Sequence, residues 1–465
     1  MRPDHGLVID MDVFGSSGVR GVVDEELTPA DALAVAQAAG TVWTADRAAV
    51  ARDTRATGEM FADAAASGLA SVGLDVDRLG PLPTPGLQAY AEREGVPGIM
   101  ITASHNPPEY NGIKLVGADG VELSRETLER TETRLGTDRV GTVPWDETGD
   151  ATRIEGARAD YVAELLAAVD RPAVADAELT VAIDPGHGAG ALTSPAFFRE
   201  LGCRVLTINA QADGHFPGRD PEPIPANLGD LRRFVRTSEA DLGVAHDGDA
   251  DRAIFVDETG EFVAGDAALA ALAAEALDAG DTVVSAVNAS QRLVDVVADA
   301  DADLSLTPIG STYIVTRIRE LRAAGERVPV AGEGNGGILF PDYRIARDGA
   351  YTAARFLALL ARTGQTASEA VAPYDNYANV RRNVAYDSDR QREAMLDAVE
   401  RTAREADATL DTTDGYRLDY GDGWVLARPS GTEPVIRVYA EAGDHERAAE
   451  LADRMSDAVS GLAVE

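Results

Sequence analysis

The fold class can be read from one short stretch, Ile99-Met100-Ile101-Thr102-Ala103-Ser104-His105-Asn106-Pro107. Its three leading apolar residues predict a buried strand, and the small and polar residues after them predict a loop that begins where the strand ends. A short apolar strand, a Gly/Pro turn and an Ala-rich helix recur in this order along much of the chain. Such recurrence is typical of α/β units that build largely parallel sheets.

Around this stretch the chain divides into four expected domains, although its length of 465 residues alone suggests about three. The first three are α/β domains with mixed sheets, and the last is an α+β domain in which a hairpin lies between two helices. In the third domain, Val328 to Ala331 is expected to form a strand. The expected boundaries are residues 1–150, 151–258, 259–372 and 373–465.

The charge balance excludes two classes of partner. The chain has 79 Asp and Glu against 42 Lys and Arg, a formal net charge of −37. Nucleic acid and anionic membranes both attract basic proteins, so neither is expected as a partner. Lys114 is the sole lysine. A drift from lysine to arginine across a genome would explain the missing lysines but not the acids, which predict a halophilic protein from a salt-loaded cytoplasm.

The single cysteine, Cys203, cannot form an intrachain disulfide, and its surroundings predict a buried thiol at the start of a strand. No apolar run has the length of a signal peptide or of a membrane span. The sequence therefore predicts a cytoplasmic protein. It does not indicate an oligomeric state.

Ser104 lies just past the carboxyl end of its strand, the edge at which open α/β sheets bind ligands. This position predicts an exposed nucleophile or a phosphate carrier. A hydrolase triad fits poorly, because no Gly-x-Ser-x-Gly elbow surrounds the serine and the adjacent His105 is badly placed to reach it. A polar turn that satisfies its own backbone stays open as the structural alternative.

Asp247-Gly248-Asp249-Ala250-Asp251-Arg252 carries three carboxylates at alternate positions. Their mutual repulsion is relieved if the loop curls around a cation, and ligands that are all oxygen select a hard cation such as Mg²⁺. An EF-hand is the rival interpretation, since Glu258 falls at its twelfth position. It fails because Arg252 occupies the position that needs glycine, and because the flanking segments favour strands over helices.

Three further loops could bind anions or sugars. Residues 428–434, Arg-Pro-Ser-Gly-Thr-Glu-Pro, combine one guanidinium with two hydroxyls and a glycine, which suits a phosphate. Residues 14–21 form a similar loop that ends in Arg20, and residues 332–337 offer Glu333 and Asn335 to sugar hydroxyls. Each loop could also be an ordinary turn. The loop at residues 184–190 lacks dinucleotide-binding spacing and receives no role.

Taken in order, the loops that contain Arg20, Ser104, Asp247, Glu333 and Arg428 resemble those of the α-D-phosphohexomutase superfamily. The resemblance covers residues 14 to about 438. It implies four domains around a central cleft, with one loop from each domain in the active site. The loop at residues 428–434 is most similar to that of phosphoglucosamine mutases. The sugar loop, with Asn335 and Gly337 where many members have serine and histidine, resembles the archaeal branch, and Ser16 stands where threonine is common.

The resemblance also implies a role for each matched residue. Ser104 would carry a phosphoryl group and, with Asp247, Asp249 and Asp251, hold one Mg²⁺ per chain. The implied catalytic set is Ser104, Lys114, Arg252, Arg20 and His105. The implied substrate-binding set is Glu333, Asn335, Arg428, Ser430, Gly431 and Thr432.

The implied activity is an intramolecular phosphotransfer between the 6 and 1 positions of a hexose, through phosphoserine and a hexose bisphosphate that also acts as activator. Glucosamine 6-phosphate is the expected substrate, with phosphomannomutase/phosphoglucomutase activity as the nearest alternative. A Mg²⁺-dependent sugar phosphatase and a non-catalytic sugar-phosphate-binding protein are more distant ones. Replacing Lys114 with arginine is expected to impair turnover and leave folding intact, because arginine cannot exchange protons.

Overall fold

The computed structural model describes residues 18–136, 141–430 and 434–461. The chain falls into two compact units. The first contains residues 1–268 and 335–370, and the second contains residues 269–334 and 371–465. No helix in the described ranges is both long enough and apolar enough to cross a membrane.

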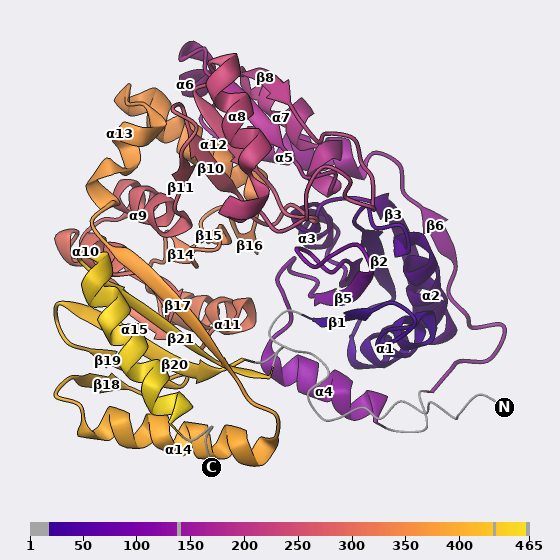
Figure 1. Cartoon of the computed structure of the whole chain (residues 1–465). Coiled ribbons are helices and arrows are strands. Elements are labelled where there is room, and N and C mark those ends of the chain that lie inside the picture. Colours follow the sequence, from indigo (N-terminus) through magenta and orange to yellow (C-terminus); the bar gives the residue numbers. More distant parts are fainter. Residues whose placement is uncertain (1–17, 137–140, 431–433, 462–465) are drawn as a thin grey trace. The chain divides into compact units, whose positions relative to one another are not determined.

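A six-stranded mixed sheet opens the first unit, in the order β1-β5-β4-β2-β3-β6 (Figure 1). Strands β4, β2, β3 and β6 run parallel to one another, whereas β5 pairs antiparallel with β4 and β1. The strands are β1 (Val19–Val22), β2 (Arg47–Arg52), β3 (Asp75–Pro81), β4 (Gly98–Ile101), β5 (Tyr110–Val116) and β6 (Ala151–Arg153). The helices are α1 (Pro29–Val42), α2 (Gly58–Ser71), α3 (Thr84–Glu94) and α4 (Arg125–Leu135).

Local sequence explains where these helices begin and how they pack. Thr28 and Asp31 form a reciprocal capping box at the start of α1, and Pro29 occupies its first turn. Buried alanines of α1 and α2, together with Phe61 and Leu69, form an apolar core with residues of the sheet. The small side chains permit close helix packing: a Cβ at Gly68 would lie 2.5 Å from the backbone oxygen of Leu33.

A second mixed sheet has the order β11-β10-β9-β7-β8. Its parallel strands are β7 (Thr180–Asp184), β8 (Arg204–Thr207) and β9 (Leu242–Ala245), and its antiparallel strands are β10 (Ile254–Asp257) and β11 (Phe262–Val263). The helices of this segment are α5 (Ala157–Ala168), α6 (Arg171–Asp176), α7 (Ser194–Leu201) and α8 (Gly229–Ser238), with 3₁₀ turns η1 (Ala189–Leu192) and η2 (Pro225–Asn227).

The third α/β stretch contributes to both units. The first unit receives the hairpin β15 (Ile338–Phe340) and β16 (Arg344–Arg347), followed by α12 (Gly349–Thr363) and α13 (Ala367–Val371). Helix α9 (Gly265–Ala276) crosses from the first unit to the second. The second unit contains β12 (Thr282–Ala286), parallel to β13 (Asp303–Thr307) and β14 (Ala331–Gly332), with α10 (Gln291–Asp299) and α11 (Ser311–Ala323).

The strand expected over Val328 to Ala331 is wrong except at its last residue. Val328 and Val330 are buried, but ladder pairing begins only at Ala331. Apolar side chains at these positions therefore reflect burial in the core. Burial alone does not require a segment to join a sheet.

The last domain contains an antiparallel sheet in the order β17-β21-β20-β19-β18. It comprises β17 (Ala378–Ala385), β18 (Thr409–Asp411), β19 (Tyr416–Asp419), β20 (Gly423–Pro429) and β21 (Val435–Ala442), with η3 (Ala372–Tyr374), α14 (Asp389–Glu405) and α15 (His445–Ser460). The predicted hairpin is present as β19 and β20, which pair antiparallel across the turn at residues 420–422. The sequence does not predict strands β17 and β18. They lie at the two edges of the sheet, where polar residues face water and the apolar alternation is weak. The predicted α/β and α+β fold class is confirmed.

Candidate active site

Two loops of the first unit meet through a hydrogen bond. Ser104 follows β4, and Asp247 follows β9. The hydroxyl of Ser104 donates to Oδ2 of Asp247 at 2.7 Å, and both side chains are buried. Ser104 has a φ of 52°, a left-handed conformation that is uncommon for a residue other than glycine. The structure thus brings together the two loops that the sequence marks for chemistry.

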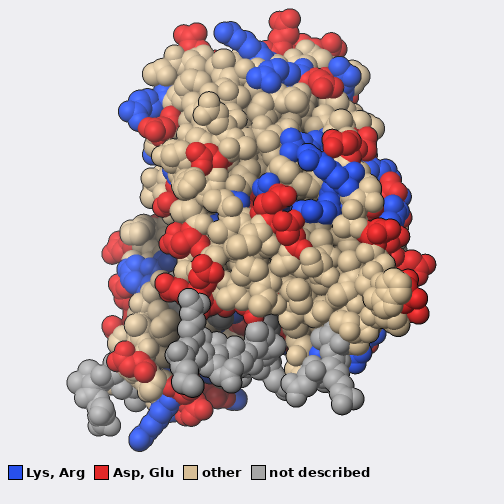
Figure 2. Space-filling view, turned by 90° about the vertical axis from the view of Figure 1, so that its right-hand side faces the viewer, with Lys and Arg blue, Asp and Glu red and all other residues tan. Residues whose placement is uncertain are grey.

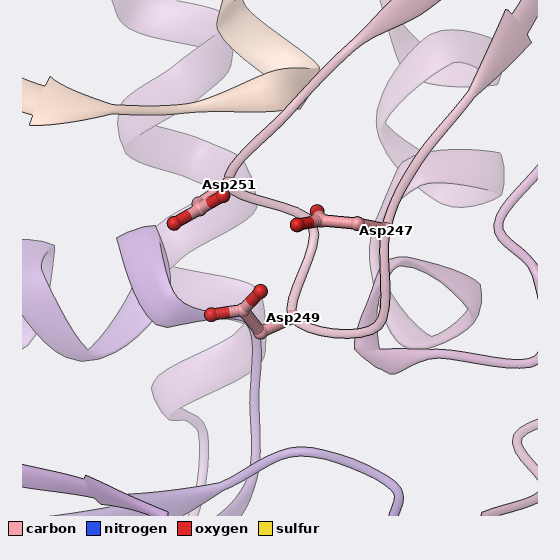
Figure 3. Close-up of side chains that lie close together, drawn as sticks. All are labelled: Asp247, Asp249 and Asp251. Carbon is pink, nitrogen blue, oxygen red and sulfur yellow. The ribbon is translucent and has the colours of Figure 1, made fainter. Parts of the chain in front are cut away.

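The loop between β9 and β10 directs three carboxylates into one space (Figure 3). Asp247, Asp249 and Asp251 are buried, and each offers an oxygen within 4.8 Å of the others. The turn needs Gly248, because a Cβ there would lie 2.5 Å from the backbone oxygen of Ser104. Within the described residues, Oδ1 of Asp249 and Oδ1 of Asp251 are buried without a hydrogen-bond partner. Converging carboxylates with unpartnered oxygens fit a hard divalent cation.

Basic groups lie beside this carboxylate cluster. Nζ of Lys114, on β5, lies 2.7 Å from Oδ2 of Asp249 and 3.2 Å from Oδ2 of Asp251. Arg347, at the end of β16, donates to Oδ2 of Asp251 at 2.8 Å. Nε of Arg252 is 3.6 Å from Oδ2 of Asp247. Positive charge from three strands or loops therefore offsets the repulsion among the aspartates.

Burial and charge shift the pKa values of these groups in different directions. Burial raises the pKa of Asp247 to about 7, and repulsion from Asp251 and Asp249 adds to the effect. Burial also opposes the charged form of Asp251, but Arg347, Lys114 and Arg252 outweigh it and hold its pKa below the ordinary value. Without a bound cation, the cluster thus resists full ionisation at Asp247.

Lys114 itself is kept protonated. Burial favours its neutral form, but Asp249 and Asp251 outweigh burial and raise its pKa. The ammonium is only 4% exposed, so its charge acts inside the site and is poorly screened by water.

His105 and Arg20 lie next to the serine. Nδ1 of His105 is 3.1 Å from a terminal nitrogen of Arg252, and Arg20 donates to Oδ1 of Asn106 at 3.1 Å. Burial, Arg252 and Arg20 together lower the pKa of His105 to about 2. The imidazole is therefore neutral, and its Nδ1 can accept the hydrogen bond from Arg252.

The predicted substrate-binding residues are divided between the units. Asn335 lies in the first unit, where its Oδ1 accepts a hydrogen bond from the backbone of Gly337. Glu333, Arg428 and Ser430 belong to the second unit, where Nε of Arg428 is 3.0 Å from Oδ2 of Asp414. Gly431, Thr432 and Ser16 lie outside the described residues.

Sequence analysis missed two contacts to the aspartates. Thr84, the first residue of α3, donates to Oδ2 of Asp249 at 2.5 Å, and Arg347 pairs with Asp251 as described above. Neither residue lies in a glycine-rich or acidic motif. Their roles depend on long-range packing, which no local pattern reports.

A buried arginine beneath the serine loop was also missed. The guanidinium of Arg55 donates to the backbone oxygens of Ser104, Asn106, Pro107 and Tyr110. Its Nε pairs with Oδ2 of Asp53 at 3.1 Å, and the same oxygen accepts a hydrogen bond from Thr102. A single side chain thus satisfies four carbonyl groups of the loop that presents Ser104.

Arg219 has an analogous position beneath the loop between β9 and β10, the candidate metal loop, called the metal loop below. Its Nε pairs with Oδ2 of Asp184 at 3.0 Å, and a terminal nitrogen donates to the backbone oxygen of His246 at 2.6 Å. Asp184 opens the loop at residues 184–190, for which the sequence predicts no role. In the structure this loop supports its neighbour: a Cβ at Gly188 would lie 2.5 Å from the backbone oxygen of Gly248.

Comparisons with known proteins agree with this geometry. The chain matches models of phosphoglucomutase/phosphomannomutase α/β/α domains I, II and III over residues 11–139, 159–260 and 264–377, and of the C-terminal domain over residues 380–458.

Two curated relatives align over nearly the whole chain. A probable phosphoglucosamine mutase of Methanopyrus kandleri is 41% identical over 96% of this chain and 97% of its own. A phosphoglucomutase/phosphomannomutase of Thermococcus kodakarensis is 39% identical over 94% and 96%. The crystal structure of a phosphoglucomutase/phosphomannomutase family protein from Burkholderia thailandensis is 27% identical, with a TM-score of 0.84 over 98% of each chain.

Proposed function

The chain belongs to the phosphoglucomutase/phosphomannomutase family, and from this premise we propose that it interconverts glucosamine 6-phosphate and glucosamine 1-phosphate. The observation that carries the proposal is the buried hydrogen bond between Ser104 and Asp247, inside a cluster of carboxylates and basic groups. Such a site can hold a phosphoryl group on the serine and neutralise its charge. The choice of an amino sugar is supported by the sequence of the loop at residues 428–434 and by the naming of the Methanopyrus relative.

In the proposed reaction, phosphorylated Ser104 donates its phosphoryl group to the free hydroxyl of the sugar phosphate. The bond between Oγ and phosphorus breaks, a bond between the sugar oxygen and phosphorus forms, and the hydroxyl proton passes to Oγ, which leaves free Ser104 and a hexose bisphosphate. That intermediate then returns its other phosphate to Ser104. The same bisphosphate, added from outside, would restore phosphoserine in a dephosphorylated chain and so act as the activator.

The residues around Ser104 supply binding and charge. Asp247, Asp249 and Asp251 would hold one Mg²⁺ per chain together with the phosphoserine, and the ion would neutralise charge on the transferred group. Lys114 and Arg252 present fixed positive charge to the same group. Arg428 and Ser430, together with Gly431 and Thr432, are proposed to bind the phosphate that does not react, and Glu333 and Asn335 to bind the sugar.

The nearest alternative is the same chemistry on mannose and glucose phosphates. It has specific support, because the Thermococcus relative is named phosphoglucomutase/phosphomannomutase and is nearly as similar to the chain as the Methanopyrus relative. Water as the acceptor would instead make the protein a phosphatase. Ser104 is 1% exposed, so the expectation of an exposed nucleophile is wrong, and measured phosphate release must distinguish water from a sugar as the acceptor.

A substrate panel tests the proposal. The three hexose 6-phosphates, of glucosamine, mannose and glucose, are supplied with Mg²⁺ and a trace of hexose 1,6-bisphosphate, and formation of each 1-phosphate is measured beside inorganic phosphate release. We expect the highest kcat/KM for the amino sugar and negligible phosphate release. A lowest kcat/KM for glucosamine phosphate would reject the substrate, and phosphate release matching substrate loss would reject the mutase. Asp251→Asn serves as the metal-site control.

A further inference from the structure

A second group of basic side chains lines a cavity in the first unit. The cavity has a volume of about 460 Å³ and lies at the ends of β2, β3 and β6. Its charged lining residues are Arg52, Arg78, Arg153, Arg158 and Glu59. None of them belongs to the site around Ser104. The right-hand side of Figure 1, where β6 lies, faces the viewer in Figure 2, and a group of basic side chains is visible there beside acidic ones.

The register of the sheet sets two of these arginines side by side. Arg78 and Arg153 are Cα partners on the parallel strands β3 and β6, so their side chains leave the same face of the sheet. Like charges at directly paired positions destabilise a sheet. The arrangement is therefore unfavourable unless something else offsets the repulsion.

The nearby carboxylates offset only part of it. Glu59 is shared, since its two oxygens accept hydrogen bonds from Arg52 at 2.7 Å and from Arg78 at 3.3 Å. Asp63 pairs with Arg78. Among the described residues, Arg153 pairs only with Glu155, two positions along the chain, and both side chains are more than 80% exposed.

Arg158 has no acidic partner in the described part of the chain. Arg158 is exposed, and its Nε donates to the backbone oxygen of Pro81, the last residue of β3, at 2.8 Å. Burial, Arg52 and Arg153 all act to lower its pKa. Its terminal nitrogens make no ion pair with a described carboxylate, in a chain with nearly twice as many acidic as basic residues.

The backbone around the cavity also favours an anion. Arg52 and Arg153 are the last residues of parallel strands, at the edge where α/β sheets bind ligands. Helix α5 begins beside them, and its N-cap, Gly156, supplies no side-chain hydrogen bond to the first turn. The first amide groups of this helix therefore lack an acceptor from the N-cap side chain.

From these observations we propose that this arginine cavity is a binding site for a small phosphorylated molecule. Arginine binds phosphate oxygens through two parallel hydrogen bonds. No described carboxylate pairs with Arg158, so its terminal nitrogens can form such bonds with a phosphate. The volume lies within the range of about 300–1,000 Å³ that is typical of small-molecule sites. The proposal does not depend on the identity of the sugar that the enzyme converts.

Pyrophosphate is a suitable probe, and amide hydrogen exchange gives a readout confined to this site. In the wild-type protein, pyrophosphate is expected to slow exchange across residues 151–158. In Arg158→Glu, the pyrophosphate concentration that gives half-maximal protection should rise at least about tenfold, because the substitution removes a charge-assisted contact and adds repulsion. The control is Arg233→Glu, which reverses the same charge on the exposed face of α8, where the side chain is 67% exposed.

Two results would overturn the proposal: no protection of residues 151–158 in the wild-type protein, or equal protection in wild type and Arg158→Glu. If Arg158→Glu fails to fold, Arg153→Glu at the 82% exposed neighbouring position provides the same comparison. Mutase turnover is expected to be unchanged in both variants. A loss of exchange protection with normal turnover therefore separates this site from the proposed catalytic one.

Discussion

Two buried Asp–Arg pairs support the loops that carry Ser104 and Asp247, and the two pairs are built alike. Asp53 follows β2 and Asp184 ends β7. In each, Oδ1 accepts a hydrogen bond at 2.8 Å from the backbone nitrogen two residues along the chain, and Oδ2 pairs with the Nε of an arginine at 3.0–3.1 Å. The arginine then donates to carbonyl groups of an adjacent loop. The same local chemistry thus appears under the serine loop and under the metal loop.

The pairs differ in how the arginine is supplied and in what it supports. Arg55 is two residues from its aspartate and satisfies four carbonyls of the serine loop. Arg219 is 35 residues from its aspartate and reaches one carbonyl of the metal loop, that of His246, while its other bonds go to strand β7 and to residues 220 and 221. Both loops lie between paired antiparallel strands, β4 and β5 for the serine loop and β9 and β10 for the metal loop, so the difference between them is the number of carbonyl groups that the buried arginine holds.

Removing the chemistry while keeping both supports should give the largest effect. Ser104→Ala is expected to lower kcat by about 10³-fold or more, because it removes the proposed phosphoryl carrier. The unfolding free energy should change by no more than about 1–2 kcal/mol, since one buried hydrogen bond is lost. Single-turnover assays and urea unfolding measure the two quantities. Retention of a tenth of the wild-type rate would contradict the assigned role.

Substitution of the two supporting arginines tests the comparison directly. Arg55→Met and Arg219→Met each leave a buried carboxylate without its partner, so each should destabilise the protein by about 3–5 kcal/mol. Among molecules that remain folded, kcat should fall further for Arg55→Met, which removes four hydrogen bonds to the segment from Ser104 to Tyr110. Urea midpoints and kcat are compared with those of Arg233→Met, an exposed control expected to lie within about 0.5 kcal/mol of wild type. An equal fall of kcat in both buried variants would show that the two supports are equivalent.

A substitution at Lys114 extends the comparison to the metal loop itself, because Lys114 pairs with Asp249 and Asp251. Lys114→Arg keeps the charge but removes an exchangeable ammonium, and kcat should fall about 10²-fold. The sequence predicts that folding stays intact. The 4% exposure of Lys114 revises this, because a larger side chain should cost about 1–3 kcal/mol. Steady-state kinetics and thermal unfolding test both effects, and a near-normal kcat would contradict the expectation that arginine cannot replace this ammonium.

Asp348 is a third buried aspartate, and it caps α12 without an ion pair in the described residues. Its oxygens accept hydrogen bonds from the hydroxyl of Tyr161 and the backbone of Tyr351. Burial raises its pKa to about 6, although these hydrogen bonds and Arg344 act in the opposite direction. Burial also raises the pKa of Asp53, against the opposing charge of Arg55, so a partner arginine does not by itself cancel the effect of burial.

The raised pKa predicts a specific pH dependence of stability. Between about pH 4 and pH 6 the folded state binds a proton at Asp348 that the unfolded state has lost, so this group's contribution to stability falls as pH rises through that window. The fall should total about 2–3 kcal/mol. Asp348→Asn should lack it, so the difference between wild type and variant, measured by urea unfolding across this range, should change with pH. A constant difference would contradict the raised pKa.

Much of the site could be predicted from sequence because its motifs are local. In the serine loop and in the aspartate loop, six consecutive residues are enough to indicate the chemistry. The structure joins the two loops by a hydrogen bond from Ser104 to Asp247. The predicted family, and with it the expectation of an enzyme that is an intramolecular phosphotransferase, is confirmed by the four domain matches.

The rest depends on tertiary packing. Arg347 reaches Asp251 across 96 residues and Thr84 reaches Asp249 across 165, and neither has a local signal. The supporting role of Asp184 was missed for the same reason, because its arginine lies 35 residues away. The four domain boundaries, the catalytic role of each residue and the cytoplasmic, salt-adapted setting stay predictions.

The sole lysine also makes the protein unusually convenient for spectroscopy. Isotopic labelling of lysine would place a single side-chain nitrogen signal in the whole chain, and that signal would arise between Asp249 and Asp251. Amine-directed reagents would likewise have one side-chain target, Lys114, which is closed to them while the first unit is folded. Ionisation, ligand arrival and local opening at the carboxylate cluster could therefore each be followed in the unmodified protein, without mutation and without an attached probe.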